Sequence, residues 1–422
     1  METSASVLKD RAEHAEPRAK TQTSGRQGFH SPIAWICKKL TRGTEKRIFH
    51  SHSYYDIHVF DSASRFVVGY QNSVVEKAIT VDDEVEVGLV DCDAKTPEWQ
   101  SIGKSRAWSW QQGPMAQFVP NTSLIVWNDR EADTLCGRAF DRRDHSTRKL
   151  SRPVYAVSPD GKWAYSLNFD RLEMLRPGYG YASEGCYRHL ESKPADDGIW
   201  RINLESGECD LILSIADAAK QWCAKKGWRF SFQTLKRRYR FWFNHIKVSP
   251  DGSRFTVKLR YRPRDLSFDW TDSLGVSLTA NEDGSDVRFL ADATSHVIWL
   301  DPSSLYLWRK NGVFLFRDAP TGGEIVKQFS PKFLRHNVHI RRLGSEGHSY
   351  VFDTPYRESI DLFELDEATG ERKLMGQFSG HRPERGPYRC DLHPCPSPDA
   401  EKVLVTSMHD GGRQIYLLQR DS

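Results

Sequence analysis

The sequence lacks any long hydrophobic run. No window of the 422 residues approaches the roughly 18 consecutive apolar residues that a membrane-spanning helix needs. The first 30 residues are polar and charged, without the apolar core of a secretory signal. We therefore expect residues 1–30 to form a disordered tail, the chain to have no membrane partner, and its location to be cytoplasmic.

Paired cysteines and a strong charge of one sign are also lacking. The eight cysteines include no C-x-x-C pair, which disfavours both a zinc ribbon and a disulfide framework, so reduced, buried thiols are expected. The 60 basic and 56 acidic residues leave a net charge of +4 without a long single-sign block, so no nucleic-acid partner is expected. The densest basic cluster, KRRYR at 236–240, is interpreted as a solvated loop or helix face.

The common nucleotide and hydrolase motifs are absent. The chain contains no Walker loop, no Rossmann glycine fingerprint, no H-E-x-x-H and no G-x-S-x-G. Nucleotide-dependent enzymes and serine hydrolases of these types are therefore disfavoured. What is present is apolar and aromatic content, 38% and 12%, which is enough for a sizeable core.

A strand–turn–strand unit recurs along the chain. VYAVSPDGKWAYSLNF at 154–169 and HIKVSPDGSRFTVKLRY at 245–261 each place Ser-Pro-Asp-Gly between two alternating apolar strands. Asp-Gly supplies the positive φ angles of a tight hairpin turn, so both units predict β-hairpins. Weaker copies begin near residues 54, 115, 296, 348 and 393.

The repeat spacing predicts the fold. Most of the seven copies are 40 to 60 residues apart, the length of a four-stranded propeller blade. We expect an all-β, seven-bladed β-propeller that forms a single domain over residues 45–422, with six blades plus a decorated loop as the alternative. A strand near 45–50 is expected to close the ring beside the C-terminal strand at 412–418. The long gap between repeats predicts a partly helical insertion around 170–240.

Four histidines begin successive inner strands of the predicted ring. His245, His296, His348 and His393 occupy equivalent places in consecutive repeats, so their imidazoles should converge on one end of the central channel. Imidazole suits divalent transition ions, and Asp391 offers an oxygen ligand or an orienting partner for His393. The pattern predicts a shared metal site. Taken singly, each histidine is also consistent with an ordinary bond to a neighbouring strand or turn.

Several stretches together resemble a known family. These are WSWQQGPMAQFVPNTSLIVWNDR (108–130), RPVYAVSPDGKWAYSLNFDRLEMLRPGYGY (152–181), FNHIKVSPDGSRF (243–255), SHVIW (295–299) and YRCDLHPCPSPD (388–399). They are similar to the oligogalacturonate lyase and TolB-like β-propeller proteins of bacteria, from about residue 50 to 420. The resemblance implies a seven-bladed propeller that holds a divalent metal, usually Mn²⁺, near its axis.

The resemblance also implies roles for residues. In the lyases, a histidine removes the C5 proton of a uronate while the metal and an arginine neutralise its carboxylate, and β-elimination follows. His245 matches the base and Arg389 is the candidate arginine, while His296 and His393 match metal ligands. Asp391 stands where the family has a further histidine, and the family's glutamine ligand has no clear counterpart. These departures favour the alternative of a non-catalytic sugar-binding propeller, and a protein-interaction propeller is the third possibility.

An acidic sugar substrate directs attention to further residues. The planar fork of arginine pairs with carboxylates, which makes Arg413, in the last hairpin, a second candidate beside Arg389. The other candidates are Gln112 and Asn128 for sugar hydroxyls, and Tyr179 and Tyr181 in RPGYGY at 176–181 for stacking. The alternative for this loop is a glycine-relaxed surface turn packed by its own tyrosines.

Overall fold

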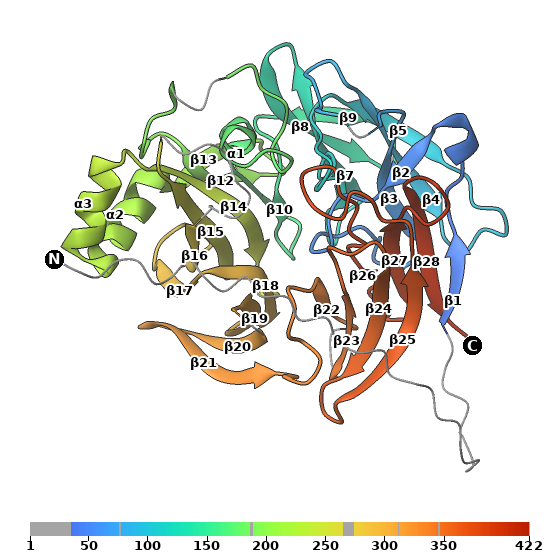
Figure 1. The fold of residues 1–422 in the computed structure, drawn as a ribbon. Helices are drawn as coiled ribbons and strands as arrows, with labels where there is room; N and C mark the ends of the chain where they lie inside the picture. Colours follow the sequence, from blue (N-terminus) through green and yellow to red (C-terminus); the bar gives the residue numbers. More distant parts are fainter. Residues whose placement is uncertain are drawn as a thin grey trace. The chain divides into compact units, whose positions relative to one another are not determined.

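Seven four-stranded antiparallel sheets follow one another around a ring in the computed structural model (Figure 1). The structure describes residues 35–75, 77–185, 189–264, 274–310, 312–344 and 347–421. The predicted seven-bladed β-propeller is therefore confirmed, and the six-bladed alternative is not. The tail expected at residues 1–30 lies outside the described residues.

Each sheet is one blade, and its strands lie in chain order from the channel outward, apart from the last blade. Blade 1 consists of β2 (Phe49–Ser51), β3 (Phe66–Asn72), β4 (Val85–Asp91) and β5 (Gln100–Ser105). Blade 2 consists of β6 (Gln117–Phe118), β7 (Leu124–Glu131), β8 (Thr134–Asp141) and β9 (Thr147–Leu150). Blade 3 consists of β10 (Ala156–Val157), β11 (Trp163–Ser166), β12 (Gly198–Asn203) and β13 (Cys209–Ser214). Blade 4 consists of β14 (Arg240–Val248), β15 (Arg254–Arg262), β16 (Leu274–Asn281) and β17 (Arg288–Asp292). Blade 5 consists of β18 (Thr294–Asp301), β19 (Ser304–Arg309), β20 (Gly312–Ala319) and β21 (Gly322–Phe329). Blade 6 consists of β22 (Ile340–Arg342), β23 (Ser349–Asp353), β24 (Ile360–Asp366) and β25 (Glu371–Phe378).

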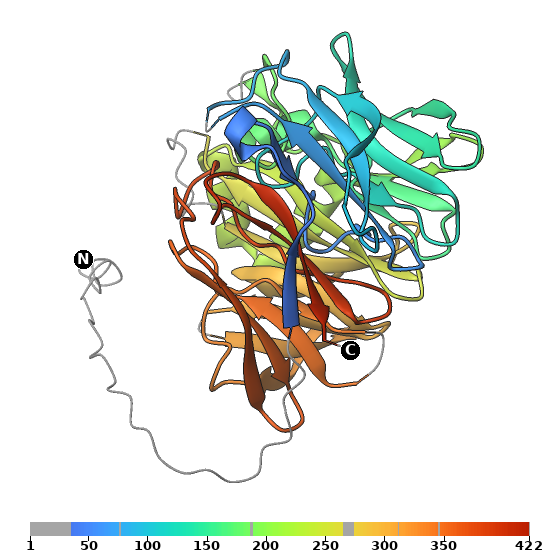
Figure 2. The same ribbon diagram turned by 90° about the vertical axis from the view of Figure 1, so that its right-hand side faces the viewer.

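The seventh blade joins the two ends of the ring. Its strands are β26 (Cys395–Pro396), β27 (Lys402–Ser407), β28 (Gln414–Arg420) and β1 (Trp35–Lys39). β1 pairs antiparallel with β28, from Trp35 opposite Arg420 to Lys39 opposite Tyr416 (Figure 2). The ring is thus closed by main-chain hydrogen bonds between strands far apart in sequence. The predicted closing strand at 45–50 is wrong, because that segment contains β2, the inner strand of blade 1.

The Ser-Pro-Asp-Gly turns form as expected. Gly161 donates its amide to the Ser158 carbonyl at 3.0 Å, and Gly252 donates to Ser249 at 2.9 Å. Both glycines have positive φ, 74° and 78°, which explains the Asp-Gly sequence at each turn. In blade 6 the hairpin runs from β22 to β23, so the stretch at 347–354 contains a second strand and not an inner one.

The helices occupy two separate connections. α1 (Phe169–Leu175) lies between β11 and β12, whereas α2 (Ile215–Lys226) and α3 (Trp228–Lys236) lie between β13 and β14. The Ser214 hydroxyl caps α2 by accepting from the Asp217 amide at 3.0 Å. The segment between these insertions is β12 and β13, so the helical part predicted around 170–240 is divided by two strands of blade 3. No helix in the described part of the chain is long and apolar enough to cross a membrane.

Candidate metal centre

Four imidazoles meet at one end of the channel, from blades 4 to 7. His245 lies in β14, His296 in β18, His339 just before β22 and His393 just before β26. The inner strand of each blade runs in the same direction through the ring, so equivalent positions reach the same mouth. The expected convergence on one end is therefore seen for three of the predicted histidines, with His339 as the fourth.

Three of these histidines have an unusual backbone. The φ angles of His245, His296 and His393 are 61°, 47° and 49°, in the left-handed region that non-glycine residues rarely occupy. The β14–β15 register shifts around His245, and the β18–β19 register shifts around His296. Such bulges redirect a side chain, and each left-handed residue costs on the order of 1–3 kcal/mol. Strain repeated at three equivalent positions is typical of a functional site.

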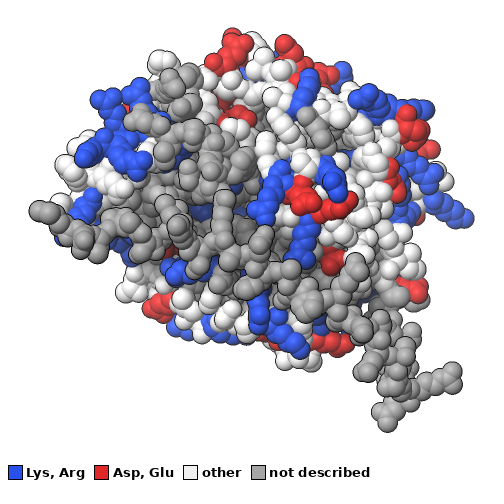
Figure 3. Space-filling view, viewed as in Figure 1, with Lys and Arg blue, Asp and Glu red and all other residues white. Residues whose placement is uncertain are grey.

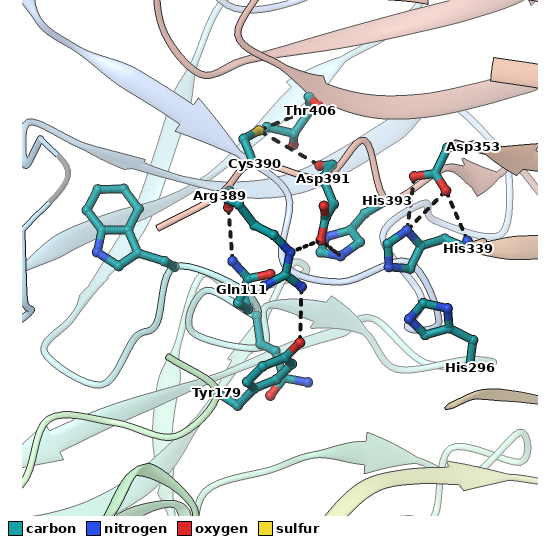
Figure 4. A network of polar contacts seen from close by, with 12 residues as sticks. Gln111, Tyr179, His296, His339, Asp353, Arg389, Cys390, Asp391, His393 and Thr406 are labelled. Carbon is teal, nitrogen blue, oxygen red and sulfur yellow. Dashed lines mark hydrogen bonds and ion pairs between the residues drawn. The ribbon is translucent and has the colours of Figure 1, made fainter. Parts of the chain in front are cut away.

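The side chains form a tight group. The ring centroids of His296 and His339 are 4.3 Å apart, and those of His339 and His393 are 4.7 Å apart. Three atoms lie within 4.8 Å of one another: one ring nitrogen of His339, one ring nitrogen of His393 and one carboxylate oxygen of Asp391. Figure 4 shows Asp391 between the Arg389 guanidinium and His393, with His339 and His296 beyond. We call His296, His339, Asp391 and His393 the histidine–aspartate cluster.

Hydrogen bonds orient two of the imidazoles. His339 Nδ1 lies 3.1 and 3.0 Å from the two carboxylate oxygens of Asp353. His296 Nδ1 donates to the Val338 carbonyl at 2.8 Å. Both contacts leave Nε2 for the cluster, as in metal sites whose histidines are held by a carboxylate or carbonyl. Burial lowers the pKa of His339, but the adjacent Asp353 outweighs it and raises this pKa.

His393 has an unsatisfied nitrogen. Its Nε2 is buried and makes no hydrogen bond within the described residues, and it lies 3.8 Å from Asp391 Oδ2. A buried polar atom without a partner is rare because it loses its bonds to water. Burial also holds the pKa of His296 and His393 well below the usual range, so both imidazoles are neutral, the form that binds a cation. These two imidazoles, that of His339 and the Asp391 carboxylate fit a divalent transition ion.

Asp391 is held by Arg389. Arg389 Nε donates to Asp391 Oδ2 at 2.8 Å, while its Nη1 and Nη2 donate to the Gly386 carbonyl and the Tyr179 hydroxyl at 3.0 and 3.1 Å. Burial opposes the charge of the guanidinium, but Asp391, Tyr179 and Tyr356 together outweigh burial and raise the pKa of Arg389. The edge of the fork expected to bind a substrate carboxylate is therefore already engaged. In this structure Arg389 positions Asp391 and Tyr179.

His245 lies beside the cluster and not within it. Its Nδ1 is 2.9 Å from the Tyr155 hydroxyl, which also accepts from Gln112 Nε2. The ring of Tyr54 stacks on His245 at 5.6 Å and meets His393 edge-on at 4.7 Å, so Tyr54 separates the two histidines. Burial holds the pKa of His245 well below its usual range. His245 is therefore a neutral, oriented imidazole that lies outside the histidine–aspartate cluster.

A recess with cationic walls adjoins the histidines. His245 and His296 line it together with Lys258 and Arg260. Lys258 donates to the Thr294 carbonyl and has no carboxylate partner among the described residues. Burial, followed by repulsion from neighbouring cations, lowers the pKa of both Lys258 and Arg260. An anion would relieve this repulsion, so the recess favours an acidic ligand.

Three predicted substrate contacts serve the wall of the ring. Asn128 Nδ2 donates to the Tyr181 hydroxyl at 2.7 Å and both side chains are fully buried. Arg413 donates to the carbonyls of Trp110, Tyr388 and Arg389 at 3.0, 2.8 and 2.9 Å. Asn128, Tyr181 and Arg413 are therefore not placed as substrate contacts, because their polar atoms form hydrogen bonds with other groups of the protein. Gln112 reaches the site only through Tyr155.

Tyr179 is the member of the tyrosine pair that reaches the site. Its ring meets His245 edge-on at 5.6 Å, and its hydroxyl bonds Arg389. Burial favours the neutral phenol, but Arg389 and Arg176 outweigh burial and lower the pKa of Tyr179 to about 8. Tyr181 instead stacks on Phe169 at 4.4 Å, inside the wall.

His348 was the wrong histidine of blade 6. Its side chain is 67% exposed and lies 4.0 Å from Glu367, at the turn between β22 and β23. The repeat that predicts His348 contains β23, the second strand of blade 6, whereas the inner strand is β22. A local signal did exist: VHI at 338–340 and NHI at 244–246 both place histidine before isoleucine, and SHV at 295–297 places it before valine. Together with the strand that follows, it would have identified His339.

Glu173 in α1 supports the loop that carries Tyr179. Its carboxylate accepts from the Gly178 and Gly180 amides at 2.8 and 3.2 Å, and burial raises its pKa from 4.5 to about 7. The unfolded chain loses this proton first, so stability falls as the pH rises from about 4.5 to about 7.

We expect Glu173→Gln to remove this decline, because the amide oxygen still accepts both bonds and carries no buried charge. At pH 8 the variant should be more stable than the parent by up to about 3 kcal/mol, while at pH 4 the two should be similar. Urea unfolding at both pH values measures the difference. An unchanged pH dependence in the variant would contradict this assignment.

The comparisons with known proteins concern fold. No protein-family model matches the sequence, and no curated protein matches it. The oligogalacturonate lyase of Vibrio parahaemolyticus superposes with a TM-score of 0.56 at 14% identity, covering 92% of this chain and 97% of that one. An oligogalacturonate lyase in complex with manganese gives 0.57, again at 14% identity, covering 93% and 97%. The likeness is one of architecture.

Proposed function

We propose that this protein is a metal-dependent lyase that cleaves uronate-containing oligosaccharides by β-elimination. The observation that carries the proposal is the histidine–aspartate cluster beside a cation-lined recess and a separate neutral imidazole, His245. Elimination from a uronate needs a carboxylate-binding group and a base, and these features supply both. The similar fold of oligogalacturonate lyase, including its manganese complex, supports the proposal.

The cluster holds the cation in this proposal. The ligands are Nε2 of His296, His339 and His393 and a carboxylate oxygen of Asp391. A bound divalent ion, Mn²⁺ by analogy with the lyase complex, supplies a Lewis acid that stabilises negative charge on the substrate carboxylate. Lys258 and Arg260 add positive charge in the adjoining recess.

His245 is the proposed base. When its Nδ1 donates to the Tyr155 hydroxyl, Nε2 presents a lone pair to the substrate. Nε2 takes the C5 proton, the C5–H electrons form the C4–C5 double bond, and the C4–O4 bond breaks. The departing oxygen must gain a proton. Tyr179, with its pKa lowered to about 8, is the proposed donor because it contacts the edge of His245.

One experiment tests the function directly. The protein is stripped with EDTA, reloaded with Mn²⁺, and incubated with uronate oligosaccharides of different linkage. We expect metal-dependent growth of the short-wavelength ultraviolet absorbance of the 4,5-unsaturated product, and mass spectra of two fragments without added water. Metal binding with sugar binding and no product would instead assign a silent sugar-binding propeller. Absence of both would assign a protein-interaction role.

Arg389→Lys distinguishes two roles for this arginine. Lysine keeps the charge but cannot bond Asp391 and Tyr179 with one planar group. Because Asp391 then loses its orientation, we expect the affinity for Mn²⁺ to fall by about 10- to 100-fold. Isothermal titration with Mn²⁺ measures this change, and the exposed Arg385→Lys is the matched control. A raised KM at unchanged Mn²⁺ affinity would instead support direct contact with the substrate carboxylate.

A further inference from the structure

Helix α3 presents a stripe of large apolar side chains to solvent. Trp228, Phe232 and Leu235 are 74%, 61% and 76% exposed. Their spacing of four and three residues places them on one face of the helix. Three such side chains within nine residues form a contiguous patch, which differs from the scattered exposed apolar residues found on most proteins.

The other face of α3 packs against the propeller. Thr234 is buried, and Phe230 packs against the rings of Trp222 in α2, Tyr239 and Tyr261, with centroids 6.4, 6.4 and 5.3 Å away. The chain therefore buries one face of the helix and leaves the other exposed. The exposed stripe is a fixed feature of the surface.

The flanks of the stripe are basic. Residues 218–239 contain seven Lys and Arg and no Asp or Glu, so this segment carries more positive charge than the net +4 of the whole chain. All seven are exposed: Lys220, Lys225, Lys226, Arg229, Lys236, Arg237 and Arg238. Within the described residues, only Lys226 lies near a carboxylate, Asp292 at 3.8 Å. Figure 3 shows Lys and Arg gathered at the upper left, over α2 and α3.

We propose that α3 docks on an anionic lipid surface, with Trp228, Phe232 and Leu235 entering the interface and the flanking cations contacting lipid phosphates. Aromatic and aliphatic side chains on one helix face with Lys and Arg around them are the features of interfacial helices. Indole favours the membrane–water boundary, and anionic lipid attracts basic clusters.

A lipid surface suits this helix better than an acidic polymer does. Leu235 is the most exposed member of the stripe, and an aliphatic side chain gains little from a nucleic-acid base or a charged sugar, whereas it gains from hydrocarbon. The proposal also goes beyond the interpretation of KRRYR as a solvated face. The proposal departs from the expectation of no membrane partner, which rested on the absence of a spanning helix, because an interfacial helix lies along the surface without crossing it. It is independent of the proposed lyase reaction.

The test is co-sedimentation of the full chain with vesicles. We expect binding to phosphatidylcholine vesicles that contain phosphatidylserine, weaker binding as salt rises, and little binding to phosphatidylcholine alone. The triple change Trp228→Ser, Phe232→Ser and Leu235→Ser should weaken binding by at least about tenfold. Ile325→Ser, Val326→Ser and Leu374→Ser form the matched control, because these exposed residues lie on the outer strands β21 and β25.

A second readout locates the contact. Brominated lipid chains should quench tryptophan fluorescence of the parent chain, and Trp228→Phe should remove most of that quenching. Equal binding by the parent and the triple serine variant would overturn insertion of the stripe. Failure to bind anionic vesicles would overturn the proposal outright. In that case, stripe-dependent self-association in light scattering would indicate that a second copy of the chain covers α3. Binding to RNA or heparin would indicate an acidic polymer.

Discussion

Replacing His393 with alanine is expected to abolish both metal binding and turnover. His393 Nε2 is the buried nitrogen without a hydrogen bond, and it belongs to the group whose ligand atoms lie within 4.8 Å of one another. Removing it takes one donor of four from the cation, so we expect the affinity for Mn²⁺ to fall by more than about 100-fold. The substrate carboxylate then loses its Lewis acid, and product formation should drop below detection.

Metal content after gel filtration and Mn²⁺ titration measure the loss. His348→Ala is the matched control, since this histidine is exposed and lies outside the cluster. A stability measurement separates loss of function from loss of folding. The φ of His393 is 49°, which glycine adopts without strain, so His393→Gly should unfold no more readily than the parent while losing the metal. Full metal binding by either variant would exclude His393 as a ligand.

Replacing His245 with alanine should separate chemistry from metal binding. His245 is divided from His393 by the Tyr54 ring and bonds Tyr155 through Nδ1, so its removal leaves the four proposed ligands in place. Loss of a general base costs about 10²- to 10⁴-fold in rate. We therefore expect kcat to fall by that factor, with Mn²⁺ affinity unchanged.

The measurement is kcat from the absorbance of the unsaturated product, beside a Mn²⁺ titration of the same preparation. Tyr155→Phe is a graded control: it removes the orienting bond at 2.9 Å but leaves the imidazole, so a smaller loss is expected. Loss of metal in His245→Ala would place this residue among the ligands. Unchanged turnover would require another base and would contradict the assignment of His245 as the general base.

The two variants form a diagnostic pair. A metal-dependent lyase predicts loss of metal in one and retention in the other, with turnover lost in both. A silent sugar-binding propeller predicts the same metal results with no turnover in the parent. If neither histidine affects metal or sugar, the polar end of the channel serves stability alone.

The propeller itself was predictable from the sequence because its signals are local. Each Ser-Pro-Asp-Gly turn needs glycine at a positive φ, as at Gly161 and Gly252, and the strands on either side alternate apolar and polar residues. Repetition of this short unit every 40 to 60 residues determines the number of blades. The same phase placed His245, His296 and His393 at one mouth, since equivalent positions of a repeat point to equivalent places in the ring.

What only the tertiary structure decided depends on contacts between blades. The ring closes through β1, which pairs with β28 from the other end of the chain. The hydrogen bond between Arg389 and Tyr179 joins residues 210 positions apart. Burial and partners of this kind arise only when distant segments pack, so no local pattern encodes them.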